Sequence, residues 1–249
     1  MALKSDPSLW YAMPGVVAAY QPIACPGGAL LARSNVAHGG TGRYPAVVVG
    51  AAPGWSPARG WIFSGAEYLT TAGHGSSGYD VTPWTMMIQF DNASLVPIMN
   101  GLCGINWFDM ASKYYGLHQY RNGSTTNVSG ALTAGNMALA GQWPYLNGVV
   151  DSAAPFTADW QASNPIWIGR NEHALGTFDA RAFLLVNRVL SPAEVFSAAR
   201  QMAWCHANPD WSVWGRRRRY YYAPSEMAAA AIYARRHQAL RAGSRGVVQ

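Results

Sequence analysis

The sequence predicts an all-β protein, and three observations support this class. From Gly15 to about Arg188, short apolar or alternating runs are separated at close spacing by Gly, Pro, Asn and Ser, which is the pattern of strands joined by turns. The same stretch lacks the helical apolar period of about 3.6 residues. Asn147-Gly148 stands between two apolar runs, and this pair best tolerates the two positive-φ positions of a type I′ hairpin turn.

The expected strands follow from the apolar and alternating runs. In chain order they are Val16–Tyr20, Ala46–Val49, Trp61–Phe63, Tyr68–Thr70, Trp84–Phe90, Tyr114–Tyr120, Met137–Ala140, Tyr145–Leu146, Val149–Asp151, Ile166–Ile168 and Arg181–Val186. Two further stretches, 51–60 with its two prolines and the glycine-rich 73–78, are expected to be loops.

Two helices are expected after the last strand. Ser191-Pro192 with Glu194 at the third helical position forms a capping box, so a short helix should run to about His206. A second helix is predicted near 226–242, with Ser225 as its cap and arginines toward its C-terminal end, where the helix dipole favours cations.

Several motifs come in a characteristic order: R-G-W-I-F-S-G-A-E-Y-L-T, W-T-M-M-I-Q-F, W-P-Y-L-N-G-V-V-D, N-P-I-W-I-G and F-D-A-R-A-F-L-L-V-N-R-V-L-S-P-A-E-V. This order resembles the laminin-G-like branch of the concanavalin A-like jelly rolls, over about residues 15–206. The resemblance implies a two-sheet antiparallel jelly-roll sandwich with long loops at one rim. We therefore expect an N-terminal arm (1–14), a jelly-roll domain (15–208) and a C-terminal docking tail (209–249).

The positive charge is concentrated in the tail. Residues 1–209 carry ten basic and ten acidic side chains, whereas the last forty residues carry eight arginines and two acids, which accounts for the net charge of +6. Arg and aromatic residues are enriched at protein interfaces, so the tail is expected to anchor the chain on an acidic partner. The expected partner-binding residues are Trp211, Trp214, Arg216, Arg217, Arg218, Arg219, Tyr220, Tyr221 and Tyr222.

Two alternatives for this basic run stay open: a phosphate-contacting patch for nucleic acid, and a solvated tail without a partner. The segment N-P-D-W-S-V-W-G-R-R-R-R-Y-Y-Y resembles the trailer that follows jelly rolls in tailed-bacteriophage virion proteins. That second resemblance implies a capsid decoration or tail-associated protein, an oligomer in a particle, bound to the major capsid or tail protein. Without a signal peptide or an apolar span, it would be assembled in the host cytoplasm, with no membrane partner.

Enzymatic activity is not expected from the sequence. Related jelly-roll glucanases place two carboxylates on one strand, because a retaining mechanism needs them about 5 to 5.5 Å apart. No such spacing occurs here, since Glu67, Glu172, Glu194 and Glu226 are isolated from one another. The motifs G-x-S-x-G and H-E-x-x-H and the Walker loop are also missing from the sequence.

Small-molecule binding gives two further hypotheses. No cofactor is predicted, although Asp91, Asn92 and Asp109 are candidate calcium ligands, because related domains hold calcium through Asp and Asn oxygens at the loop rim. Carbohydrate binding needs aromatic platforms, for which Trp55, Trp107 and Trp143 are candidates, while the tryptophans within apolar strands, Trp61, Trp84 and Trp167, are expected in the core. The sequence thus favours a non-enzymatic virion structural protein, with a lectin module for host or surface glycans as the alternative.

Overall fold

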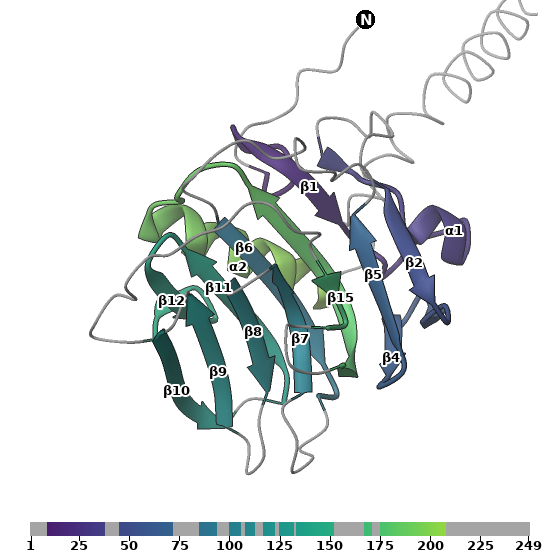
Figure 1. Ribbon diagram of the computed structural model, residues 1–249. Helices are drawn as coiled ribbons and strands as arrows, with labels where there is room; N and C mark the ends of the chain where they lie inside the picture. Colours follow the sequence, from purple (N-terminus) through teal and green to yellow (C-terminus); the bar gives the residue numbers. More distant parts are fainter. Residues whose placement is uncertain are drawn as a thin grey trace, which may run out of the picture.

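The computed structural model describes residues 9–37, 45–71, 85–93, 100–105, 108–112, 117–122, 125–131, 133–151, 167–170 and 175–207. Within these ranges the protein is an all-β sandwich of two antiparallel sheets with two short helical elements (Figure 1). The predicted fold class is confirmed.

The first sheet has eight strands. Its order is β13-β12-β11-β6-β15-β4-β3, and β1 also pairs with β15. The bounds are β1 Val16–Tyr20, β3 Gly54–Ser56, β4 Gly60–Ser64, β6 Thr85–Asp91, β11 Gly135–Ala140, β12 Trp143–Leu146, β13 Val149–Val150 and β15 Thr177–Val186.

The second sheet has seven strands in the order β10-β9-β8-β7-β14-β5-β2. The bounds are β2 Ala46–Gly50, β5 Glu67–Thr71, β7 Asn100–Ile105, β8 Phe108–Ser112, β9 Leu117–Asn122, β10 Thr125–Ala131 and β14 Trp167–Ile168. In register, Val47 of β2 lies opposite Thr70 of β5, which lies opposite Trp167 of β14 and then Gly104 of β7.

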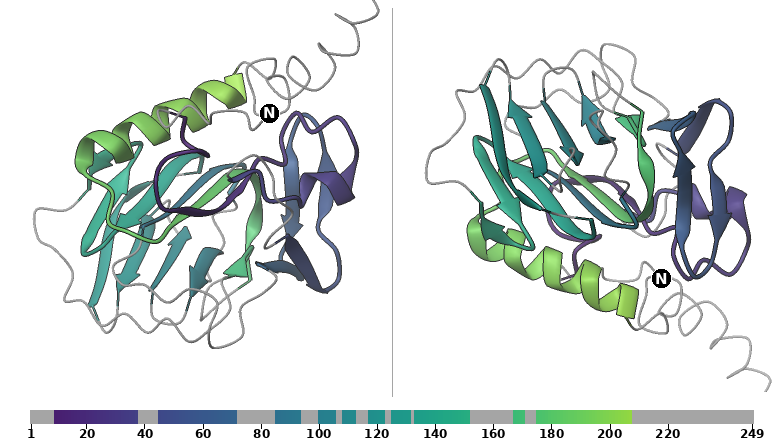
Figure 2. Two further views of the ribbon diagram at one scale, coloured as in Figure 1. Left: turned by 90° about the horizontal axis from the view of Figure 1, so that it is seen from above. Right: turned by 90° about the horizontal axis from the view of Figure 1, so that it is seen from below.

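Two apolar layers hold the fold together. The layer between the sheets combines Trp61 and Phe63 of β4 with Leu69 of β5 and Ile168 of β14, all nearly inaccessible to solvent. The second layer lies between the eight-stranded sheet and α2 (Pro192–Ala207). Figure 2 shows α2 along one side of the sandwich, while α1 (Ala29–Ala32) lies beside the β2 edge.

Helix α2 begins as predicted. The Ser191 amide and hydroxyl both donate to Glu194 Oε2 at 2.9 Å, and the Glu194 amide donates back to Ser191 Oγ at 3.4 Å. These bonds form the capping box. Arg188 adds an ion pair, with its Nη2 atom 2.6 Å from Glu194 Oε1. The side-chain hydrogen bond from Arg188, assisted by the Ser191 bonds, lowers the pKa of Glu194 to about 2.

The hairpin turn at Asn147-Gly148 also forms as predicted, with φ values of 51° and 83°. These are the two positive-φ positions of a type I′ turn. The turn lies against α2, since a side chain at Gly148 would come within 2.9 Å of the Phe196 Cα atom.

The first described residues pack onto the same layer as α2. Trp10 and Met13, which the sequence assigned to an N-terminal arm, are 1% and 5% exposed. The Trp10 amide donates to Gln201 Oε1 of α2 at 3.0 Å. Position 10 is therefore tied to the helix that ends the described chain.

The predicted tail, residues 209–249, lies outside the described residues. This includes Trp211, Trp214, Arg216–Arg219 and Tyr220–Tyr222, so the anchoring hypothesis stays a prediction. In the parts that are described, no helix has the length and apolar character needed to cross a membrane.

Candidate functional site

Of the three tryptophans proposed for carbohydrate binding, the two that the structure describes lie on different strands of one sheet. Trp55 on β3 is half-buried, packs against both apolar layers, and donates from Nε1 to the Pro22 carbonyl at 2.9 Å. Trp143 on β12 is 36% exposed. Since β12 and β3 are five strand steps apart, the two strands lie about 24 Å apart across the sheet at the usual strand spacing. Trp107 lies outside the described residues.

The calcium candidates are also separated. Asp91 ends β6 in the eight-stranded sheet, whereas Asp109 belongs to β8 in the seven-stranded sheet. Over the described ranges, no group of three or more His, Cys, Asp or Glu side chains comes together as a metal site.

Asp91 and Asn92 instead join an ion-pair network that also contains Asp179. Asp91 lies opposite Asp179 in the β6–β15 register. Asp179 is 1% exposed and binds Arg59 through two bonds of 2.9 Å, and Asn92 Nδ2 donates to it at 2.6 Å. Arg181 reaches Asp91 Oδ2 at 3.2 Å and also donates to the Ala58 carbonyl. The network ties the β3–β4 hairpin to the ends of β6 and β15.

A different group stands on the other sheet. Arg170 places its guanidinium carbon 5.1 Å from the ring centroid of Tyr68 and 5.1 Å from that of Trp167. These three residues, all half-buried, are called the aromatic–arginine cluster below. Tyr68 lies on β5 and Trp167 on β14, which are paired strands. The cluster thus combines two rings with one cation at cation–π distance.

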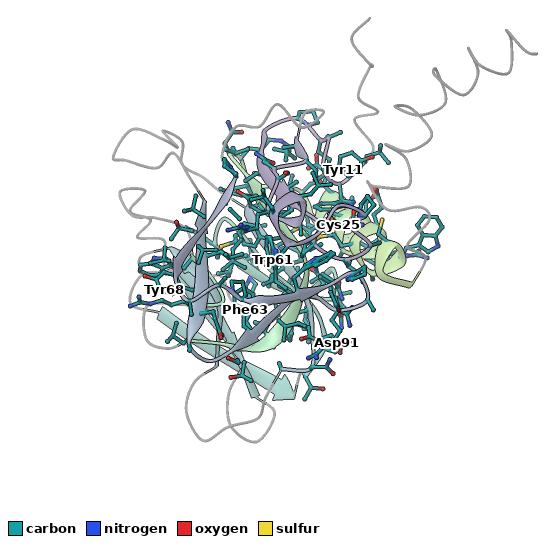
Figure 3. The ribbon with its side chains drawn as sticks, turned by 90° about the vertical axis from the view of Figure 1, so that its right-hand side faces the viewer. Tyr11, Cys25, Trp61, Phe63, Tyr68 and Asp91 are labelled. Carbon is teal, nitrogen blue, oxygen red and sulfur yellow. The ribbon has the colours of Figure 1, made fainter. Side chains whose placement is uncertain are left out.

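Strand alternation places this cluster on the outer face. Leu69 and Ile168, the neighbours of Tyr68 and Trp167, are both 0% exposed and lie in the layer between the sheets. Because successive side chains point to opposite faces, Tyr68 and Trp167 point away from that layer. Figure 3 shows Tyr68 at the margin of the molecule, while Trp61 and Phe63 lie inside it and Asp91 lies toward the opposite side.

Gly169 makes the position of Arg170 feasible. Its φ is +88°, and a Cβ atom at this position would come within 2.4 Å of the Phe63 ring. Glycine is therefore required both by the backbone conformation and by the close approach to the core. The Gly176 amide then donates to the Gly169 carbonyl at 2.7 Å, and Arg170 bridges to Leu175, so Arg170 is held where the chain turns back.

Sequence reasoning missed the cluster. Trp167 was predicted to be a core residue, but it is half-buried on the outer face. The prediction was right for Trp61, which is 1% exposed, and Trp84 lies outside the described residues. The signal that could have found the cluster is the alternation in Trp167-Ile168-Gly169-Arg170, in which a fully buried Ile168 requires Trp167 to point outward.

The comparisons with known proteins give structural relatives. No protein-family model and no curated protein sequence matches this chain. A sialidase from Trypanosoma rangeli aligns with a TM-score of 0.54 and 13% identity over 75% of this chain and 33% of the sialidase chain. This protein thus spans about a third of the sialidase's length.

Two further solved structures share the fold. Domain 4 of AbnA, a GH43 extracellular arabinanase from Geobacillus stearothermophilus, solved in complex with arabinotriose, aligns with a TM-score of 0.53 and 12% identity over 74% of this chain and 98% of that domain. The receptor-binding domain of botulinum neurotoxin D gives a TM-score of 0.51 and 10% identity, over 75% of this chain and 52% of that one. At these identities the likeness concerns the fold.

The comparisons correct the prediction that this chain is not an enzyme. The same sandwich forms part of a sialidase and of an arabinanase, so excluding enzymes for this fold was wrong. The physical reason is that sequence reasoning looked for carboxylates spaced along one strand. Carboxylates on different strands leave no linear motif: Asp91 and Asp179, which here pair with Arg181 and Arg59, lie opposite each other although they are far apart in the sequence.

Proposed function

We propose that this protein is a carbohydrate-binding module and that it holds sugar on the aromatic–arginine cluster. The observation that supports this most is the pair of rings, Tyr68 and Trp167, on an outer sheet face with Arg170 over both. The C–H groups of a sugar ring pack on aromatic faces, and neighbouring polar groups orient its hydroxyls.

The surroundings of Trp167 favour this use. Its register partner on β7 is Gly104, which has no side chain, so nothing from that position competes for the indole. On the other side its partner is the half-buried Thr70, whose hydroxyl can donate and accept hydrogen bonds. An aromatic ring between a bare backbone position and a hydroxyl suits a sugar better than an apolar ligand.

The placement of the helices adds support. Helix α2 packs on the eight-stranded sheet, and no described helix covers the outer face of the seven-stranded sheet (Figure 2). Of the three relatives reported above, one is a sialidase, one is an arabinanase domain solved with arabinotriose, and one is a receptor-binding domain. The arabinotriose bound to the arabinanase domain accords with a glycan ligand on this fold. No observation on the described residues favours the virion hypothesis, which depended on the tail.

The test is a glycan array with the full chain and three variants. Trp167→Ala and Tyr68→Ala should each reduce the signal of bound glycans about tenfold or more, as truncation of a central aromatic contact does. Trp143→Ala is the control, since it removes an exposed tryptophan from the other sheet. An array without any bound glycan would refute the function. Loss of binding with Trp143→Ala alone would move the site to β12.

A further inference from the structure

We infer that the aromatic–arginine cluster selects sugars that carry a carboxylate. This inference rests on the proposed function and deepens it, because it names the class of glycan. It depends on Arg170, which lies over two aromatic rings and forms no ion pair with a described carboxylate.

Three other arginines are already neutralised by this chain. Arg59 binds Asp179, Arg181 binds Asp91, and Arg188 binds Glu194. For Arg170, the contacts within the described part of the chain are with the faces of two rings, and no described carboxylate accepts a bond from it. Glu67, which precedes Tyr68, is held by the Ser64 amide and hydroxyl at 2.8 and 2.7 Å.

The chemistry of the guanidinium explains what Arg170 can bind. The five N–H donors of arginine lie in the plane of the group, and no described carboxylate uses them at Arg170. Its position over the rings of Tyr68 and Trp167, 5.1 Å from each centroid, also reduces the side-chain freedom that would be lost on binding. A planar fork of donors matches a carboxylate bidentately, and such charged bonds are about twice as strong as neutral ones.

The two aromatic rings and the guanidinium together indicate the class of ligand. An uncharged sugar could use the rings but would give the guanidinium only hydroxyl acceptors. A small anion could use the fork but would leave the rings uncovered. A sugar ring bearing a carboxylate uses both, since its C–H face packs on an aromatic ring while its acid group reaches Arg170.

The experiment begins with a glycan array that contains neutral and carboxylated glycans, probed with the full chain and with Arg170→Gln. We expect the bound set to be enriched in carboxylated glycans. The strongest of these is then titrated as the free acid and as its methyl ester, which keeps the ring and removes the charge. The ester and the Arg170→Gln variant should each weaken binding about tenfold or more, the size of a charged hydrogen-bond pair.

Arg200→Gln is the matched control. Arg200 also lies over an aromatic ring, 5.6 Å from the Phe196 centroid, but it is exposed and lies on α2 beside the other sheet. Arg200→Gln removes the same charge from a different surface, so its affinity for the free acid should stay within about twofold of that of the unmodified chain. Thermal unfolding of both variants checks that they are folded.

The outcomes separate the two proposals. Binding restricted to neutral glycans, or equal affinity for acid and ester, would overturn the carboxylate inference and leave the proposed function in place. Equal losses in Arg170→Gln and Arg200→Gln would also overturn the inference, because they would reflect net charge. A chain that binds no glycan at all would refute the proposed function, and the inference with it.

Discussion

The interaction of Glu194 with Arg188 and Ser191 allows a quantitative test of the fold. Glu194→Gln keeps a side chain that can complete the capping box, but removes the charge that pairs with Arg188 at 2.6 Å. The variant therefore measures the charge separately from the cap. It also has a defined pH dependence, because the bonded carboxylate has a pKa of about 2 in the folded protein.

The sign follows from the direction of the shift. The pKa is depressed from 4.5 to about 2 on folding, so the charge stabilises the folded state above pH 4.5, and this stabilisation is lost as the pH falls toward 2. A shift of this size corresponds to roughly 3 kcal/mol at most. The two side chains are 33% and 37% exposed, so solvent screening reduces the expected value to about 1–2 kcal/mol.

The assay is urea unfolding followed by tryptophan fluorescence, at pH 7 and in steps down to pH 2.5. We expect Glu194→Gln to lower the free energy of unfolding by about 1–2 kcal/mol at pH 7 and by much less at pH 2.5. Ser191→Ala is the comparison variant for the cap: it should lower the free energy of unfolding by about 1 kcal/mol at pH 7. Its pH dependence should be weaker than that of Glu194→Gln, because the Arg188 bond is the largest cause of the lowered Glu194 pKa and stays in place. A Glu194→Gln difference that stays constant from pH 7 to pH 2.5 would refute the assigned ion pair.

Two other substitutions test the close approach of Gly169 to the core and the ion-pair network around Asp179. Gly169→Ala should destabilise the protein by more than about 2 kcal/mol, because its Cβ would meet the Phe63 ring at 2.4 Å. Gly50→Ala is the control, because Gly50 also has a positive φ, +75°, but a Cβ atom there would meet nothing within 4 Å. It should lower the free energy of unfolding by only about 1 kcal/mol in the same denaturation assay. Equal losses in the two variants would argue against the close approach of Gly169 to Phe63. Asp179→Asn should cost about 1–3 kcal/mol, less than a fully buried pair because Arg59 is 51% exposed; an unchanged unfolding midpoint would show that the network contributes nothing.

The parts of the fold with strong local signals could be predicted from the sequence. The Ser191–Glu194 capping box and the Asn147-Gly148 turn depend on neighbours within four residues, and both are present as expected. The strands at 16–20, 61–63 and 137–140 were also recognised, since their apolar runs face buried layers.

Strands with weak local signals were missed. Strand β3, Gly54–Ser56, lies in a stretch interpreted as a loop because of its prolines, and it is an edge strand paired only with β4. Strands β7 (N-G-L-C-G-I) and β10 (T-T-N-V-S-G-A) contain glycines and few β-branched apolar residues, and their register partners on adjacent strands define them. Pairing between distant segments is a property of the folded chain that no local pattern reports.

The candidate site escaped prediction for the same reason. Tyr68 and Trp167 are about a hundred positions apart in the sequence, and only the β14–β5 pairing makes them neighbours. Trp143 was the more obvious candidate from its position beside a turn. Trp143 is exposed, but within the described residues no cationic side chain lies over its ring. It therefore lacks a neighbouring polar group that could orient a bound sugar.

The burial of the described strands distinguishes the two sheets. Strands β6 and β15, in the centre of the eight-stranded sheet, are buried on both faces at every position except Asp91 and Thr177. This follows from α2 covering their outer side. In β5, by contrast, the buried Leu69 is flanked by the half-buried Tyr68 and Thr70. A continuous apolar run thus marks a sheet that is covered twice, whereas alternation marks a sheet with one open face. Tyr68 of the aromatic–arginine cluster lies on such an alternating strand, and no described helix covers it, which supports the proposed ligand.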